Sequence, residues 1–209
     1  MKFYDCKTAP SPRRVRIFAA EKGMQLDTVQ IDLGAGEQFG DDYRAINPEC
    51  VVPALQLDDG TVITEVFAIC QYLEEQQPEP VLLGGTPQQR AFVTMWNIKA
   101  EQQGLWACAE ALRNSVPGLK GRAMPGPDDF EQIPELAARG RARITVFQAK
   151  LEQRLADSEF LAGSFYSIAD ITALVTMDFA TRLKIPIPDD CVNLQRWYEA
   201  VSGRPSASA

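Results

Sequence analysis

The sequence predicts two folding units, a small α/β domain followed by an all-helical domain. Strand-like and helix-like segments alternate over roughly the first eighty residues, and no strand-like segment follows them. Residues 79–86 are rich in proline and glycine, which is typical of a linker. We therefore expect domains at residues 1–78 and 87–209, with a mixed four-stranded sheet in the first.

The first part of the chain shows the pattern strand, helix, strand. Lys2–Asp5 is a short strand-like run. Ser11 followed by Pro12 is typical of a helix start, with the serine as N-cap and the proline in the first helical position. Gly23 favours the end of that helix. Leu26–Asp32 then alternates between apolar and polar residues, which predicts a second strand.

A hairpin and a helix complete the first domain. The apolar segments Ala54–Leu57 and Thr61–Ile63 flank Asp58-Asp59-Gly60, and glycine suits the positive φ that such a turn needs. Glu65–Gln76 has helical spacing. With a further helix in the polar segment after the second strand, the expected order is β-α-β-(α)-β-β-α.

The second domain has helical periodicity only. Residues 88–112 and 134–156 predict long helices, and 114–133 between them is rich in proline and glycine. A loop of that length inside a compact domain is often a lid or a binding loop. Ser167 to Asp170 forms a capping box that opens a helix to about Leu183. A last short helix is expected at Asn193–Val201.

Composition excludes several kinds of chemistry. The chain has no histidine, which removes Ser-His-Asp triads, Cys-His pairs and imidazole zinc sites, and we expect no metal. The net charge of −7 disfavours nucleic acid and anionic membranes as partners. Five cysteines without a C-x-x-C pair are typical of reduced thiols in a cytosol. We see no signal peptide and no membrane span, and expect a cytoplasmic protein.

Four stretches resemble the glutathione S-transferase superfamily: SPRRVRIFAAEKG (11–23), NPECVVPALQLDDG (47–60), TEVFAICQYLEE (64–75) and FYSIADITA (165–173). The resemblance covers nearly the whole chain. The local spacing, including GEQF at 36–39, is most similar to the zeta and related bacterial branches. The resemblance implies a thioredoxin-like first domain that binds glutathione and a helical-bundle second domain.

The resemblance implies a backbone contact to glutathione at Val52. The Val52–Pro53 bond is expected to be cis, which is a minority state of X–Pro bonds. The amide and carbonyl of Val52 would then pair with the cysteinyl part of glutathione like an added β-strand. Gln38 matches a glutamine that contacts glutathione in the zeta branch; alternatively it is a solvated loop residue.

The resemblance places the γ-glutamyl end of glutathione at Glu65 and Val66. A carboxylate suits the ammonium group of that end, although an acid near a helix start is also favoured by the helix dipole alone. The family usually has serine where this chain has Val66. The amide of Val66 is retained, but a hydrogen bond of roughly 1.5–3 kcal/mol to a charged group is missing or replaced.

The position that activates the thiol in the family falls on Ala9, which cannot donate a hydrogen bond. The remaining donors are Ser11, our first choice, then Thr8, Cys6 and the free amides where the first helix begins. Ser11 is equally well explained as a plain N-cap, and Cys6 is an alternative redox residue. The arginines of that helix are expected mainly to form a solvated face, namely Arg13, Arg14 and Arg16.

The second substrate, a small hydrophobic electrophile, would bind between the domains. Trp96, Trp106 and Arg113 lie on the first long helix of the second domain, and loop 114–133 is a candidate cover. Aromatic residues at helical spacing are also typical of a protein core. Of these residues, Trp106 and Arg113 are the candidates for the pocket. Asp170 is expected to support folding rather than catalysis, because in the family it caps and orients a central helix.

The resemblance predicts a glutathione transferase. Glutathione is the cosubstrate, its thiolate attacks the electrophile, and the protein is expected to be a homodimer. The alternative is a non-enzymatic binding or interaction module of the same fold, because Ala9, Val51 and Val66 each lack a polar group that relatives use. A third reading, a glutaredoxin-like reductase, is weakened by Ala9.

Overall fold

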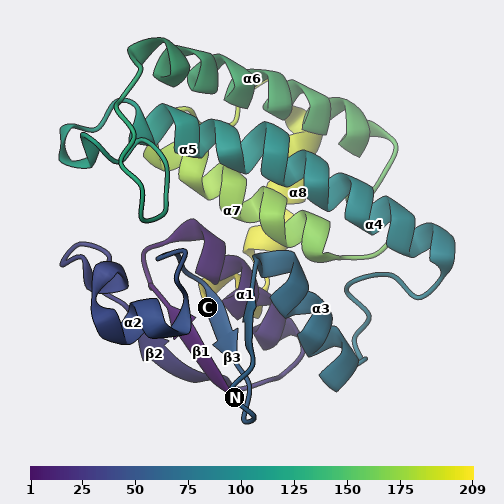
Figure 1. Ribbon diagram of the computed structural model, residues 1–209. Coiled ribbons are helices and arrows are strands. Elements are labelled where there is room, and N and C mark those ends of the chain that lie inside the picture. Colours follow the sequence, from purple (N-terminus) through teal and green to yellow (C-terminus); the bar gives the residue numbers. More distant parts are fainter. The chain divides into compact units, whose positions relative to one another are not determined.

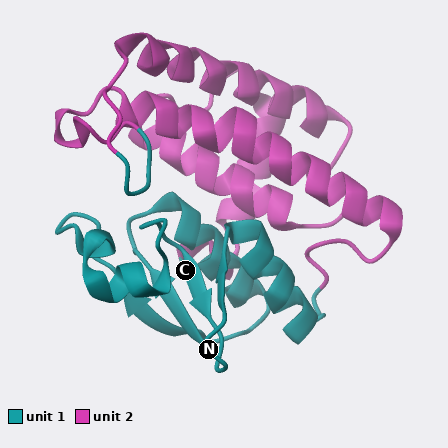
Figure 2. Ribbon diagram, in the orientation of Figure 1, with its two compact units in different colours: residues 1–80, 124–128, 209 teal, residues 81–123, 129–208 magenta.

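The computed structural model describes residues 1–209, which divide into two compact units. The first contains residues 1–80, 124–128 and 209, and the second contains residues 81–123 and 129–208 (Figure 2). The domain limits expected at residues 78 and 87 stay predictions. None of the helices is both long and apolar enough to cross a membrane.

The first unit is built on a mixed four-stranded sheet in the order β2-β1-β3-β4 (Figure 1). The strands are β1 (Lys2–Asp5), β2 (Asp27–Gln30), β3 (Ala54–Gln56) and β4 (Val62–Thr64). β1 runs parallel to β2, and β3 runs antiparallel to both of its neighbours. The predicted sheet is confirmed, with β2 shorter than the alternating segment suggested.

The helices of the first unit are α1 (Pro10–Glu21), α2 (Asp41–Ile46) and α3 (Val66–Gln76), with a 3-10 turn η1 at Glu37–Phe39. α1 packs against α3. Both helices bury one apolar face, because their apolar residues recur at helical spacing. The predicted order of elements in this unit is therefore confirmed.

The start of α1 differs from the prediction. The helix begins at Pro10, its N-cap is Ala9, and no side chain caps it. Proline fixes its own φ near the helical value and needs no hydrogen-bond acceptor, so Pro10 takes the first helical position and moves Ser11 inside the helix. The prediction of Ser11 as N-cap is wrong. The end is as expected, since Gly23 follows the helix with φ +65°.

The hairpin between β3 and β4 is confirmed. Gly60 has φ +89°, and its amide donates to the Leu57 carbonyl at 3.0 Å. The Asp59 carboxylate accepts from the Thr61 amide at 2.8 Å. The glycine is needed here because residues with a side chain rarely adopt this φ.

The second unit is helical throughout. Its helices are α4 (Pro87–Lys99), the π-helix η2 (Ala100–Leu105), α5 (Trp106–Arg113), α6 (Pro134–Ala156), α7 (Ile168–Arg182) and α8 (Val192–Ser202), with 3-10 turns η3 (Pro117–Leu119) and η4 (Pro205–Ser208). α7 contacts α4, η2, α5 and α8 and buries eleven of its fifteen residues. It is therefore the central helix of this unit.

The predicted helix 88–112 contains a π-helical segment that the sequence did not indicate. At Gly104, in η2, an added Cβ would lie 2.5 Å from a ring carbon of Phe147 and 2.8 Å from the methyl group of Thr176. Glycine therefore allows η2 to pack directly on α6 and α7. Nearby, the Thr172 hydroxyl donates to the Asn97 side-chain oxygen at 2.7 Å.

The capping box of α7 is confirmed and forms part of a larger network. One Asp170 oxygen accepts from the amide and hydroxyl of Ser167, at 3.1 and 3.0 Å. The other accepts from the Leu161 amide at 2.9 Å and the Trp197 indole at 3.0 Å. The carboxyl group is fully buried, and burial raises its pKa to about 6 despite these donors.

The segment 114–133 has its own hydrogen bonds. The Gln132 side-chain amide donates to the carbonyls of Arg113 and Val116, both at 2.8 Å. The Asn114 side chain accepts from the Ile133 amide at 3.0 Å. The two ends of the loop are thereby tied together at the end of α5. Its function as a lid stays a prediction.

Candidate functional site

Three turns of the first unit meet at one edge of its sheet. Tyr4 of β1 pairs with Ala54 of β3, and Ala54 pairs with Thr64 of β4. The chain leaves β1 and β4 at that edge and enters β3 there. Residues 6–9, 51–53 and 65–66 are therefore neighbours, and we call them the sheet-edge site. β2 is parallel to β1, so the segment leading to η1 also starts at this edge.

Val52 provides an unpaired backbone amide and carbonyl at this edge. The Val52–Pro53 bond is cis, as predicted. Neither backbone group of Val52 makes a hydrogen bond within the chain. The preceding carbonyl, that of Val51, accepts from the Tyr43 hydroxyl at 2.6 Å and the Asn47 amide at 2.8 Å. The backbone is thus fixed up to Val51 and open to an added strand at Val52.

Tyr43 and Asn47 are site residues that the sequence reasoning missed. They lie four residues apart at α2, so they share one side of a helical turn. Tyr43 is buried, and burial raises the pKa of its hydroxyl to about 12, which keeps the hydroxyl a hydrogen-bond donor. The sequence signal that could have indicated them is a tyrosine and an asparagine four residues apart, shortly before the turn that contains Pro53.

Glu65 places an exposed carboxylate at the N-terminus of α3. It is the N-cap residue, with φ +65°, and its side chain makes no capping hydrogen bond. Its carboxylate has no hydrogen-bond or ion-pair partner within the chain, and neither has the Val66 amide. A glutamate with positive φ is uncommon and tends to occur at functional sites. An unpaired carboxylate and an unpaired amide thus lie side by side.

Gln38 is buried, so its interpretation as a solvated loop residue is wrong. It lies on η1 and is 2% exposed. Its side-chain oxygen has no hydrogen-bond partner. Buried polar atoms are nearly always paired, and an orphaned one needs an explanation such as a missing ligand.

The start of α1 has fewer free amides than predicted. Pro10 and Pro12 have no N–H group, so Ser11 alone supplies one among the first three helical residues. The Ser11 hydroxyl accepts from the buried Arg14 guanidinium at 3.4 Å. Thr8 is exposed, and its hydroxyl oxygen is 3.4 Å from the Cys6 sulfur. Hydroxyl groups are therefore the main remaining donors for a thiolate.

Two of the three arginines of α1 do not belong to a solvated face. Arg14 is 2% exposed. Arg16 forms an ion pair with the buried Asp5, with 2.5 Å between the charged atoms. The prediction of a solvated arginine face is wrong for both residues, because each packs against the unit's interior rather than pointing to solvent.

The candidate residues for the second substrate lie in the second unit. Trp106 and Arg113 both belong to α5, and Trp106 is 44% exposed, so a core role for this tryptophan is excluded. The Arg113 guanidinium donates to the Arg122 carbonyl at 3.3 Å. Burial and the nearby Arg122 charge lower the pKa of Arg113.

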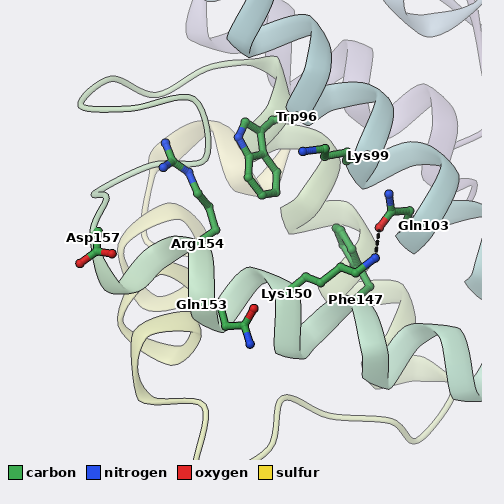
Figure 3. Close-up of a pocket in the computed structure, with 8 residues that line it drawn as sticks. All are labelled: Trp96, Lys99, Gln103, Phe147, Lys150, Gln153, Arg154 and Asp157. Carbon is green, nitrogen blue, oxygen red and sulfur yellow. Dashed lines mark hydrogen bonds between the residues drawn. The ribbon is translucent and has the colours of Figure 1, made fainter.

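A separate pocket of about 440 Å³ lies in the second unit (Figure 3). It is lined by Trp96, Lys99, Gln103, Phe147, Lys150, Gln153, Arg154 and Asp157. The Lys99 ammonium is 4.5 Å from the centre of the Trp96 ring, and the Lys150 ammonium donates to the Gln103 oxygen at 2.7 Å. Neither Trp106 nor Arg113 lines this pocket, which is therefore distinct from the predicted second-substrate residues.

Comparison with known proteins identifies the family. Residues 8–76 match the N-terminal domain of glutathione S-transferases, and residues 125–205 match their C-terminal domain. Glutathione S-transferase 2 of Saccharomyces cerevisiae is 34% identical, over 99% of this chain and 87% of that protein. The chain belongs to the glutathione S-transferase family.

Solved structures of glutathione S-transferases have the same fold as this chain. A glutathione S-transferase domain-containing protein of Marinobacter aquaeolei is 38% identical with a TM-score of 0.90, covering 99% of both chains. Gtt2 of Saccharomyces cerevisiae is 33% identical with the same TM-score, over 99% of this chain and 98% of its own. Family membership favours the transferase reading over the non-enzymatic module.

The zeta-like character of the sequence is local. Maleylacetoacetate isomerase of Pseudomonas aeruginosa is 41% identical, but only over 44% of this chain and 44% of that protein. Similarity over the full length is instead found with the yeast glutathione S-transferase 2. The assignment to the zeta branch therefore has weak support.

Proposed function

We propose that the sheet-edge site binds glutathione and lowers the pKa of its thiol for attack on a small electrophile. The observation that carries this proposal is the unpaired amide and carbonyl of Val52, beside a backbone that Tyr43 and Asn47 fix. A cysteinyl main chain that adds here would satisfy both Val52 groups. Gln38, on the segment that leaves β2 at this edge, adds a buried side-chain oxygen without a partner within the chain.

The γ-glutamyl end of glutathione would be held at α3. The exposed Glu65 carboxylate suits its ammonium group, and the unpaired Val66 amide at the helix N-terminus suits its carboxylate. No hydroxyl at position 66 adds to that contact. We expect glutathione affinity to depend strongly on Glu65 for this reason.

Ser11 is the first candidate for stabilising the thiolate. Arg14 donates to its oxygen, and a donated hydrogen bond from a cation polarises the hydroxyl and makes its own proton a better donor. Thr8 is the second candidate. The thiol proton leaves to solvent, the sulfur forms a bond to the electrophilic carbon, and the leaving group or the adjacent π-bond takes the electron pair. Catalysis is thiolate stabilisation and positioning.

The remaining parts of the proposal concern partners. Trp106 and Arg113 are proposed to contact the second substrate, and turnover of such electrophiles would be a detoxification reaction in the cytoplasm.

A homodimer is supported by three apolar side chains on α4 that remain exposed in the single chain: Phe92, Met95 and Ile98 are 41%, 38% and 44% exposed.

Calorimetric titration with glutathione tests the site. Removing the carboxylate in Glu65→Ala should weaken binding by about 10- to 100-fold, the equivalent of one charge-assisted hydrogen bond. Glu75→Ala is the matched control, because Glu75 is an exposed glutamate at the other end of the same helix. Absence of binding to the unaltered protein at millimolar glutathione, or equal effects of both substitutions, would refute the proposed site.

A further inference from the structure

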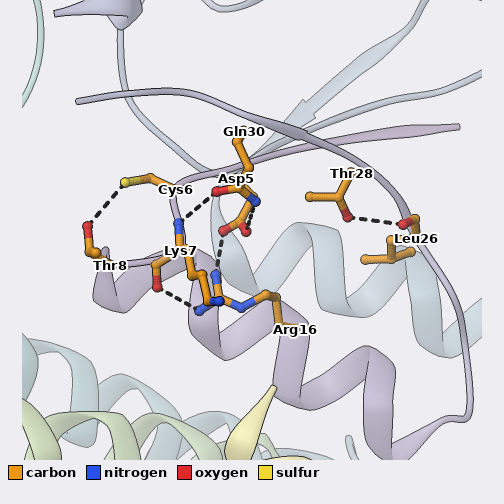
Figure 4. A network of polar contacts seen from close by, with 8 residues as sticks. All are labelled: Asp5, Cys6, Lys7, Thr8, Arg16, Leu26, Thr28 and Gln30. Carbon is orange, nitrogen blue, oxygen red and sulfur yellow. Dashed lines mark hydrogen bonds and ion pairs between the residues drawn. The ribbon is translucent and has the colours of Figure 1, made fainter. Parts of the chain in front are cut away.

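A closed ring of polar contacts surrounds the first turn of the sheet-edge site (Figure 4). The Arg16 guanidinium pairs with one oxygen of Asp5 at 2.5 Å, and the Gln30 side-chain amide donates to the other at 2.6 Å. The Gln30 oxygen accepts from the Lys7 amide at 2.9 Å. Arg16 also donates to the Lys7 carbonyl at 3.0 Å, which closes the ring.

The ring contains an ion pair, Asp5–Arg16, whose charged groups are largely buried. The Asp5 side chain is 1% exposed and that of Arg16 is 17% exposed. Burying a charge is unfavourable unless its hydrogen-bonding groups are satisfied, and here both carboxylate oxygens have a donor. Such a pair holds its members in one geometry more strictly than a surface pair does.

The ring holds the backbone of the turn after β1, in addition to linking β1 with β2. β1 and β2 are already joined by their ladder, and the Ile31 amide donates to the Asp5 carbonyl at 2.7 Å. That pairing ends at Asp5. The ring extends to the amide and carbonyl of Lys7, which the ladder does not reach, and so fixes both polar groups of a residue inside the turn.

The turn held in this way carries one hydroxyl donor, Thr8, and leads directly into α1, which carries the other, Ser11. The Ala9 amide donates to the Cys6 carbonyl at 2.9 Å and closes the turn, and the Thr8 hydroxyl lies against the Cys6 sulfur. Ser11 follows within two residues. We propose that Asp5, Arg16 and Gln30 are positioning residues of the transferase reaction, which fix the turn and the start of α1 so that the hydroxyls of Thr8 and Ser11 meet the glutathione sulfur. This inference rests on the proposed function.

The variant Arg16→Lys tests the ring with its charge retained. Arg16 reaches Asp5 with one guanidinium nitrogen and the Lys7 carbonyl with the other, whereas lysine carries all its donors on a single nitrogen and lacks this fork. Gln30→Met is the second variant, which keeps the Asp5–Arg16 ion pair and removes both contacts of Gln30, to the Lys7 amide and to the second Asp5 oxygen. The pKa of the thiol of bound glutathione is measured from the ultraviolet absorbance of its thiolate. Calorimetry gives the affinity, and thermal unfolding gives stability.

We expect both variants to raise the pKa of the bound thiol by about one unit, a tenfold loss of thiolate preference. Glutathione affinity measured below the thiol pKa should stay within about twofold, because Val52 and Glu65 are untouched, and kcat/KM at that pH should fall about tenfold. Arg139→Lys, which alters the Arg139–Glu110 ion pair in the second unit, is the matched control.

The results of this experiment distinguish the positioning inference from the proposed glutathione site. An unshifted thiol pKa in folded Gln30→Met, or an equal shift in Arg139→Lys, overturns the positioning inference and leaves the glutathione site standing. A shifted pKa with unchanged affinity supports it. Failure of the unaltered protein to bind glutathione removes the proposed function and this inference with it.

Discussion

Asp170 is a buried acid that stabilises three parts of the second unit at once. It bonds the N-terminus of α7, the Leu161 amide and the Trp197 indole. A plain N-cap contributes typically about 1 kcal/mol. The additional buried donors would be left unpaired by truncation, so we expect the residue to matter for folding beyond a cap, as a structural residue and not a catalytic one.

Asp170 should make stability depend on pH. Its pKa in the folded protein, about 6, is above the ordinary value of 3.8, so the folded state binds this proton more tightly. Its contribution is therefore fully present below about pH 4 and is lost as the pH rises through 6. Relative to Asp170→Asn, the unaltered protein should gain about 2–3 kcal/mol of unfolding free energy between pH 7 and pH 4.

Urea unfolding of both proteins across that pH range measures the difference directly. An equal substitution at an exposed aspartate, Asp157→Asn, is the control for a general effect of lost charge. A difference between the unaltered protein and Asp170→Asn that stays constant from pH 4 to pH 7 would show that burial does not govern this carboxyl group.

Only some residues of the candidate site could be predicted from the sequence. Val52, Glu65 and Val66 could be proposed from the sequence, because the contacts predicted for them use backbone groups or an exposed carboxylate at a recognisable position. The burial of Gln38 and the Tyr43–Val51 hydrogen bond depend on how η1 and α2 pack, and a polar loop segment has no periodicity that reports packing.

The π-helix η2 is the element with the most unusual geometry. π-helical turns are rare and often occur at functional sites. Here the segment joins α4 to α5 and packs on α6 and α7. Gly104 lies where a side chain has no room, so the close approach of these helices depends on one residue.

Gly104→Ala should destabilise the second unit. The new methyl group would overlap the Phe147 ring and the Thr176 methyl group, and overpacking of this kind costs typically 1–3 kcal/mol. Thermal unfolding should show the loss as a lower Tm. Gly118→Ala is the control, because nothing lies within 4 Å of its added Cβ. Equal Tm values for the two variants would contradict the packing account.

Element boundaries were predictable where the chain carries strong stop and start signals. β1 at Lys2–Asp5 and α6 at Pro134–Ala156 match the expected ranges, because charged residues end β1, a proline opens α6 and Asp157 follows its last residue. The sequence does not fix the start of α1, because Pro10 and Pro12 both suit a first helical turn and the serine between them is a favourable N-cap residue. The π-helix η2 carries no signal in the hydrophobic periodicity, and its close packing on α6 and α7 is visible only in the structure.

At the scale of the whole molecule, the fold is that of a glutathione S-transferase, and the sequence predicts Ala9 at the position that activates the thiol in the family. Its class followed from alternation in the first unit and helical periodicity in the second. Under the proposed function, the reaction depends on the hydroxyls near Ala9, which would supply the hydrogen bond that alanine cannot. A site that binds glutathione without changing its thiol would be a binding module, so affinity alone cannot separate the two functions.

The most direct test is the pKa of the glutathione thiol in complex with the unaltered protein, measured from thiolate absorbance over a pH titration. The account predicts a pKa at least about one unit below that of free glutathione, with the shift reduced in Ser11→Ala or Thr8→Val. Bound glutathione whose thiol pKa equals that of the free peptide would contradict thiolate activation and leave a protein that binds glutathione without activating it.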